Sequence, residues 1–288
     1  MKIFNSIVWG VFVVLFAVNS AFGQRKDQLA DNAALRYWAA FSQVQDAGIT
    51  NQEAKELNAI LDGTAPYDDA KYSGLLEKNA LAIKIIARGT EIPNCDWGLD
   101  YGLGDDTPVE YVREALALGR LNVLYALHLF KNGKKDEGVQ TLVAGLRFSR
   151  DLANGGSLFP TINAKDLLTL HLRAIADMLR VEQLSTMQRQ QLQQAVMKLG
   201  SHGVDWRAAI QVEMQLLNKP PWQKSVPLEQ VTSAYLATVA DPSQLEHLQQ
   251  VLAGIPEPLR DVIPNPQAVV QQKQELDDQI QQTRTLLQ

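Results

Sequence analysis

Residues 107–133, TPVEYVREALALGRLNVLYALHLFKNG, decide the fold class because one long helix fits them from end to end. Leucines recur at three- and four-residue spacing, which is the period of a helix with one buried face. Thr107 and Glu110 have the spacing of a capping box, and Pro108 falls at the first helical position. Gly133 is typical of a helix end. The stretch predicts a helix that begins after Thr107 and ends at Gly133.

Most of the remaining chain has the same period, and no segment reads convincingly as a strand. Helices are expected over about 26–45, 50–63, 69–89, 135–153, 161–181, 185–200, 206–217, 228–240, 243–253 and 267–287. In 161–181 leucines occur all round the helix, so this helix is expected to be central and the most buried. The chain is therefore predicted to be all-α, an irregular stack of antiparallel helical hairpins without a sheet.

One hairpin resembles a tetratricopeptide unit. Over 118–146, large and small residues fall near that repeat's usual positions: Tyr125, Leu129, Gly133, Gly138, Leu142 and Gly145. The small glycines would let the two helices approach closely. No second copy lies at a multiple of the repeat length of about 34 residues, so we do not expect a regular array.

A second resemblance combines Asn94-Cys95-Asp96-Trp97-Gly98 with Arg150-Asp151-Leu152-Ala153. This combination is similar to a group of exported bacterial proteins of unassigned function. The resemblance implies export and a helical fold, and it implies no activity.

The first 23 residues have the layout of a secretory signal peptide. Lys2 gives a positive start, Ile7–Val18 is an apolar stretch of 12 residues, and small residues stand at Ala21 and Gly23. A membrane-spanning helix needs about 20 residues, so we expect cleavage after Gly23 rather than a retained anchor. No cysteine follows the cut to carry a lipid. The mature chain is thus expected to be periplasmic or secreted, without stable membrane insertion.

Composition excludes some functions and stabilising devices. The formal net charge is -5, and the chain has no dense basic patch, so we expect no nucleic-acid partner. Cys95 is the only cysteine, so the chain can form no internal disulfide and its stability must come from helix packing.

We divide the chain into the signal peptide, a helical domain over 24–254, a proline-rich connector over 255–266 and a glutamine-rich helix over 267–288. That last helix is expected to dock onto the body, or else to join two copies of the chain.

The long loop over 90–107 is the first candidate site, because loops of this length are uncommon in compact domains and often functional. We name five of its residues as candidates for ligand or partner binding: Cys95, Asp96, Trp97, Asp100 and Tyr101. Its aspartates are potential calcium ligands, but their spacing is not that of an EF-hand loop, so we predict no metal and no other cofactor. Cys95 would be a nucleophile only with a histidine beside it, and a small buried side chain next to Trp97 is the default interpretation.

Four polar residues that interrupt apolar helices complete the candidate set: Arg120, His128, Asp166 and His171. A buried charge needs a partner, so we expect Arg120 and Asp166 to bridge two helices. The two histidines are expected to be satisfied core residues, with a shared pocket between them as the functional alternative.

These patterns favour an exported, soluble helical scaffold or binding protein without catalytic activity, whose partner is a protein of the cell envelope. The alternative is a cell-envelope hydrolase or lyase with an acidic site in a helical groove, built from Asp96, Asp100 or Arg120.

Overall fold

The computed structural model describes residues 31–45, 50–217 and 228–288, and these are built from helices without a strand. The predicted signal peptide lies outside the described residues. The helices are α2 (Ala33–Phe41), α3 (Asn51–Leu61), α4 (Asp69–Gly89), α5 (Tyr111–Lys131), α6 (Lys135–Leu152), α7 (Leu158–Val181), α8 (Thr186–Met197), α9 (Trp206–Leu217), α10 (Leu228–Ala240), α11 (Leu245–Ala253), α12 (Glu257–Arg260) and α13 (Pro266–Leu287), with short 3₁₀ helices η1 (Tyr101–Asp106) and η2 (Pro242–Gln244). The all-α prediction is confirmed.

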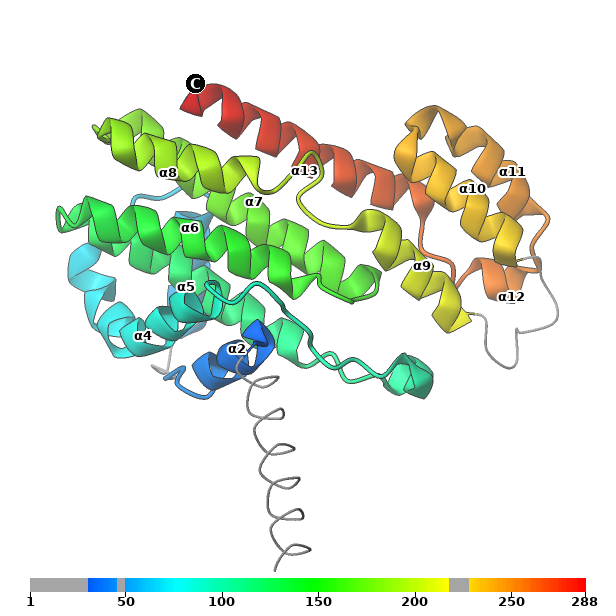
Figure 1. Cartoon of the computed structure of the whole chain (residues 1–288), viewed down its shortest axis with the longest axis horizontal. Helices are drawn as coiled ribbons and strands as arrows, with labels where there is room; N and C mark the ends of the chain where they lie inside the picture. The colour runs from blue at the N-terminus through cyan, green and yellow to red at the C-terminus, as the bar shows by residue number, and fades with distance from the viewer. Residues whose placement is uncertain (1–30, 46–49, 218–227) are drawn as a thin grey trace, which may run out of the picture.

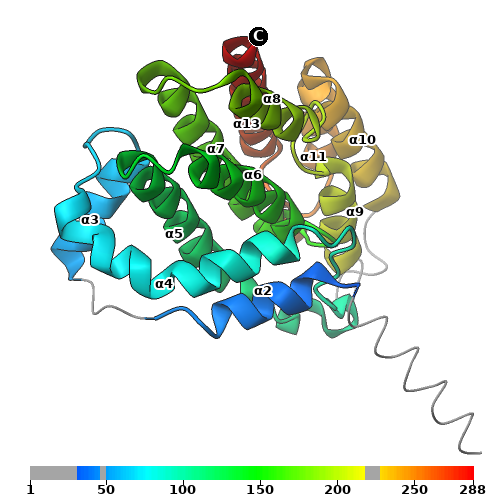
Figure 2. The same cartoon turned by 60° about the vertical axis from the view of Figure 1, so that its left-hand side comes forward.

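Consecutive helices α5, α6 and α7 pack side by side at the centre (Figure 1). Helices α2 and α4 cover one side of this group, and α8 and α13 cover the other (Figure 2). Helices α9, α10 and α11 form the end of the molecule near the start of α13 (Figure 1). Helix α5 packs against α6, as a helical hairpin would. The resemblance of this hairpin to a tetratricopeptide unit stays an expectation.

Glycines allow the central helices to approach closely. A Cβ at Gly138 would lie 2.9 Å from the Phe130 ring, and one at Gly119 would overlap Leu167. At Gly145 it would lie 2.5 Å from Asn122 Oδ1. Real side chains rarely make such contacts, so residues larger than glycine would force the helices apart.

Helix α7 lies between α5, α6, α9 and α13, in agreement with its apolar sequence. The side chains of Leu167, Leu168, Leu172 and Ile175 are fully buried in the shared core. Because this helix contacts four others, its position also fixes the spacing of the helices around it.

The sequence has the capping-box pattern at Thr50, Thr107 and Ser185, and two of these three predicted boxes are present. Thr50 with Glu53 begins α3, and Ser185 with Gln188 begins α8. The third prediction, at Thr107, is wrong: α5 begins at Tyr111, and its N-cap residue makes no side-chain cap. The Thr107 hydroxyl instead donates to the carbonyl oxygens of Gly104 at 2.7 Å and Asp100 at 3.1 Å, which closes the η1 turn.

The buried face of α2 also differs from the predicted one. The helical period places Leu35, Trp38 and Phe41 on one stripe and so predicts that all three point inward, but Leu35 and Trp38 are 39% and 44% exposed. Tyr37 is fully buried instead. The reason is a polar partner that hydropathy ignores, because the Tyr37 hydroxyl donates to the buried carboxylate of Asp151 at 2.8 Å.

Helix α13 docks along α7 and α8. The helical period predicts one apolar stripe on this helix, and it is buried there: Val269, Leu276, Ile280 and Leu287. The stripe also includes Thr283, which is buried because its hydroxyl donates to the Gln279 carbonyl oxygen at 2.8 Å. The proline-rich segment before α13 is held by Tyr235, whose hydroxyl donates to Pro264 O at 3.0 Å. Association of two copies through α13 stays a prediction.

None of the helices in the described ranges combines the length and the hydropathy that crossing a bilayer requires.

Candidate functional site

The loop between α4 and α5 is tied to the start of α2. The Asn32 side chain accepts from Asp96 N at 2.9 Å and donates to Asp96 O at 2.8 Å. Ala33 N donates to Asn94 O at 2.8 Å, completing a single bridge between the two segments. The loop that we predicted to be functional is therefore fixed along its first half.

Trp97 and Cys95 anchor the same loop to the end of α6. Trp97 Nε1 donates to Asp151 O at 2.7 Å, and its ring stacks on Tyr111 with centroids 4.2 Å apart. Cys95 Sγ lies 3.8 Å from the same carbonyl oxygen. Burial raises the pKa of the Cys95 thiol, which keeps it protonated. Both residues therefore anchor the loop; Trp97 is buried, whereas Cys95 is half-buried and not the fully buried side chain that its default interpretation predicted.

A buried carboxylate that sequence reasoning missed lies beneath this loop. Asp151 is fully buried, and Arg147 Nε lies 2.8 Å from its Oδ1 while Tyr37 donates to Oδ2. Burial raises the pKa of Asp151, and the ion pair with Arg147 and the Tyr37 hydroxyl oppose that rise. Arg147 also donates to Pro93 O at 2.6 Å. The sequence signal that could have indicated this ion pair is the spacing of Arg147 and Asp151, four residues apart near the end of a helix.

The loop aspartates serve as local caps. Asp96 Oδ1 accepts from Gly98 N at 2.9 Å, and Asp100 Oδ1 accepts from Gly102 N at 2.8 Å. Tyr101 lies half-buried near Ser157, and burial raises the pKa of its phenol. No group of three metal-ligating His, Cys, Asp or Glu side chains gathers anywhere in the described part of the chain.

The predicted bridge between Arg120 and Asp166 is wrong. Arg120 is exposed on α5, and the Asp166 side chain is 58% exposed beside Lys165 at 3.4 Å. The cation buried on α7 is Lys165, which pairs with Glu275 of α13 at 2.9 Å. Asp166 follows the buried Lys165 by one position, which puts its side chain on the exposed side of α7 and not on the inward face.

The two histidines do not face each other across a pocket. His128 Nδ1 lies 2.6 Å from Asp69 Oδ1 at the start of α4. His171 is fully buried between α5, α6 and α7, where Nε2 lies 3.1 Å from Asn122 Oδ1 and Nδ1 lies 2.8 Å from Leu167 O. Burial lowers the pKa of His171 to about 4, so the ring is neutral near pH 7. His171 is a satisfied core histidine, as its default interpretation predicted.

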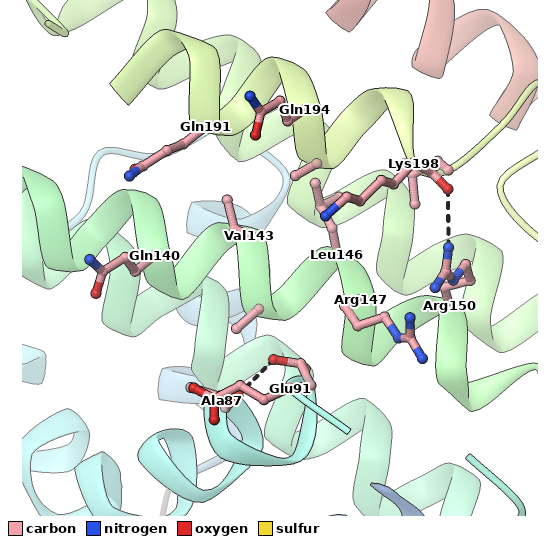
Figure 3. A pocket seen from close by; sticks show the side chains of 14 residues that line it. Ala87, Glu91, Gln140, Val143, Leu146, Arg147, Arg150, Gln191, Gln194 and Lys198 are labelled. Carbon is pink, nitrogen blue, oxygen red and sulfur yellow. Dashed lines mark hydrogen bonds between the residues drawn. The ribbon is translucent and has the colours of Figure 1, made fainter. Parts of the chain in front are cut away.

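A groove of about 480 Å³ lies on the opposite side of α6 from this histidine, between the end of α4, α6 and α8 (Figure 3). None of the nine candidate residues named from the sequence lines it. Its floor is apolar and is formed by short or buried side chains, Val143, Ala144, Leu146, Ala195 and Leu199. The groove is thus an open surface site with an apolar floor between three helices.

The rim of the groove is polar. Glutamine side chains lie toward one end, on both α6 and α8: Gln140, Gln191 and Gln194 (Figure 3). Three cations lie toward the other end: Arg147, Arg150 and Lys198. Glu91 stands on the α4 side as the one acidic lining residue (Figure 3). Such a rim can hydrogen-bond and attract a charged ligand, but it contains no imidazole or thiol for acid–base or nucleophilic chemistry.

The cationic end is held in place by backbone contacts. Arg150 donates to the carbonyl oxygen of Lys198 at 3.0 Å, which ties the end of α8 to α6 (Figure 3). Burial and the neighbouring Arg147 both lower the pKa of Arg150. A second groove of about 490 Å³ adjoins the first and shares Arg150 and Leu199 with it.

Comparisons with protein families, with curated proteins and with solved structures found no match to this chain.

Proposed function

We propose that this chain is an exported, soluble helical binding protein that takes a segment of an envelope protein into the groove between α4, α6 and α8, without catalysing a reaction. The observation that carries the proposal is the make-up of that groove: an apolar floor under a rim of amides and cations. Such a lining offers contact area and hydrogen bonds, the ingredients of recognition.

The placement of the carboxyl, thiol and imidazole groups with perturbed pKa values supports binding over catalysis. Enzymes concentrate such groups in an open cleft. Here the carboxyl, thiol and imidazole groups with the clearest shifts toward the neutral form are Asp151, Cys95 and His171. They are engaged in packing and loop anchoring, and none lines the groove.

The hydrolase or lyase alternative gains no support from the contacts of its candidate residues. Asp96 and Asp100 accept from glycine N–H groups of their own loop, and Arg120 is exposed on α5. No observation favours it as a second proposal.

Export rests on the first 23 residues alone. We expect the protein recovered from outside the cytoplasm to begin at Gln24. Intact-mass measurement tests this, and a full-length mass in the cytoplasmic fraction would contradict it.

Photo-crosslinking tests the binding function. A photoreactive residue at Gln194, on the groove rim, is expected to give discrete adducts with envelope proteins. The same residue at exposed Gln281 of α13 is the matched control. Equal adduct patterns at the two positions, or no adduct at Gln194, would refute the assignment of the groove.

A further inference from the structure

We propose that the groove recognises an acidic peptide segment, with ligand carboxylates seated between Arg150 and Lys198. This inference rests on the proposed function and names the chemistry of its ligand. It follows from the charge, the length and the lining of the groove.

The charge of the groove is opposite to that of the whole chain. The chain carries a formal net charge of -5, yet three of the four charged residues lining the groove are cations. Arg147 is neutralised by buried Asp151. Arg150 and Lys198 have no such carboxylate, because among the described residues neither forms an ion pair. These two cations therefore remain available to an anionic ligand.

Crowding of positive charge points to the same ligand. Arg147 and Arg150 stand three positions apart on α6, so their side chains share a face of that helix. Burial and the proximity of Arg147 lower the pKa of Arg150, while the nearby Asp151 carboxylate opposes this shift. A carboxylate placed between Arg150 and Lys198 would offset the positive charge of both side chains, and guanidinium–carboxylate hydrogen bonds are among the stronger ones in proteins.

Glu91 sets the orientation of the ligand. It stands on the α4 side of the groove, is exposed and forms no ion pair among the described residues (Figure 3). Its carboxylate repels an anion from that wall and thereby favours the α6–α8 side, where Arg150 and Lys198 lie.

The dimensions and the amides indicate a peptide. From Gln140 to Arg150 the helix axis advances about 15 Å, which an extended chain covers in about five residues. Glutamine side chains on both walls each provide donors and acceptors for backbone groups of the ligand. No aromatic ring lines the groove, so it has no stacking platform for a nucleobase. The adjoining groove at Arg150 offers a path for a longer segment.

Fluorescence anisotropy of a labelled hexapeptide with four glutamates and two leucines tests the inference. The full mature chain is expected to bind it saturably, and binding should weaken as salt is raised. The same peptide with glutamines in place of glutamates should bind at least about tenfold more weakly. The double variant Arg150→Gln/Lys198→Gln should lose about tenfold for the acidic peptide only, and Glu91→Gln should bind it more tightly. Lys84→Gln removes an exposed cation elsewhere on α4 and is the matched control.

The outcomes separate this inference from the proposed function. Absence of saturable binding, equal affinity for the two peptides, or unchanged affinity in the double variant would overturn the acidic ligand. Displacement by free glutamate at the peptide's own concentration would also overturn it, because a small dicarboxylate would then suffice. Ala195→Trp fills the groove floor and should abolish binding; melting curves check that each variant is folded. If the charge variants bind normally but Gln194 still crosslinks to a partner, the groove function stands and only the acidic ligand fails.

Discussion

Replacing Gly145 by alanine tests the packing of the central helices. Gly145 of α6 lies against His171 of α7 and Asn122 of α5. An added Cβ would lie 2.5 Å from Asn122 Oδ1 and closer still to the imidazole ring. Both neighbours are fully buried, so they have no solvent-filled space into which to move. We expect the substitution to separate His171 from Asn122.

The expected cost combines three effects. Overpacking a core costs about 1–3 kcal/mol, and leaving a buried hydrogen-bonding group unpaired costs about 1–3 kcal/mol. Alanine regains about 1 kcal/mol because it is the better helix former. The sum is a loss of about 3 kcal/mol in the free energy of unfolding, which for a chain of this size lowers the melting temperature by about 6–12 °C.

Urea denaturation followed by circular dichroism measures this loss. Gly74→Ala in α4 is the matched control, because nothing lies within 4 Å of its added Cβ. That variant is expected to gain up to about 1 kcal/mol from helix propensity alone. If Gly145→Ala is as stable as the parent chain, or shifts in the same direction as Gly74→Ala, the close packing inferred around His171 is wrong.

The remaining predictions concern His171, Asp151 and Cys95, which anchor the core and the loop. The unfolded chain protonates His171 below about pH 6.5, whereas the folded ring, with its pKa lowered to about 4, stays neutral. Between pH 7.5 and 4.5 the free energy of unfolding should therefore fall by about 2–3 kcal/mol, a loss that His171→Gln should not show. Urea titrations at both pH values measure this, and equal losses in the two chains would contradict it. Asp151→Asn should lower the free energy of unfolding by about 2–4 kcal/mol because it leaves Arg147 without its carboxylate. Asp166→Asn, the exposed control, should change it by less than about 0.5 kcal/mol. Equal melting curves for the two variants would contradict the structural role of the Asp151–Arg147 pair. Cys95 should react with a thiol reagent far more slowly in the folded chain than in urea, and equal rates would show that it is accessible.

Apolar spacing predicted the fold well where one face of a helix is buried by hydrophobic contacts alone. Leu167, Leu172 and Leu276 illustrate this, because each is buried where the helical period placed it. The capping boxes at Thr50 and Ser185 were also predicted correctly, because the side chain and the backbone group that it accepts from lie within one helical turn. Local patterns suffice when the partner lies three or four residues away.

Prediction failed where the partner lies far away along the chain. Tyr37 is buried because of Asp151, which stands 114 positions later. The groove is assembled from Glu91, Arg150 and Lys198, which only helix packing brings together. No window of the sequence contains that arrangement, and none of the predicted candidates lines the groove; three of the five loop candidates, Cys95, Asp96 and Trp97, anchor α2 and α6 instead.

The most direct test of the groove as an acidic-peptide site is the effect of Lys198→Glu on the dissociation constant of the glutamate hexapeptide. Lys198 is exposed, and its ammonium forms no ion pair among the described residues, so reversing its charge should leave the melting temperature nearly unchanged. We expect the dissociation constant to rise more than about tenfold, since an attraction becomes a repulsion beside the ligand carboxylate. A dissociation constant equal to that of the parent chain would contradict it.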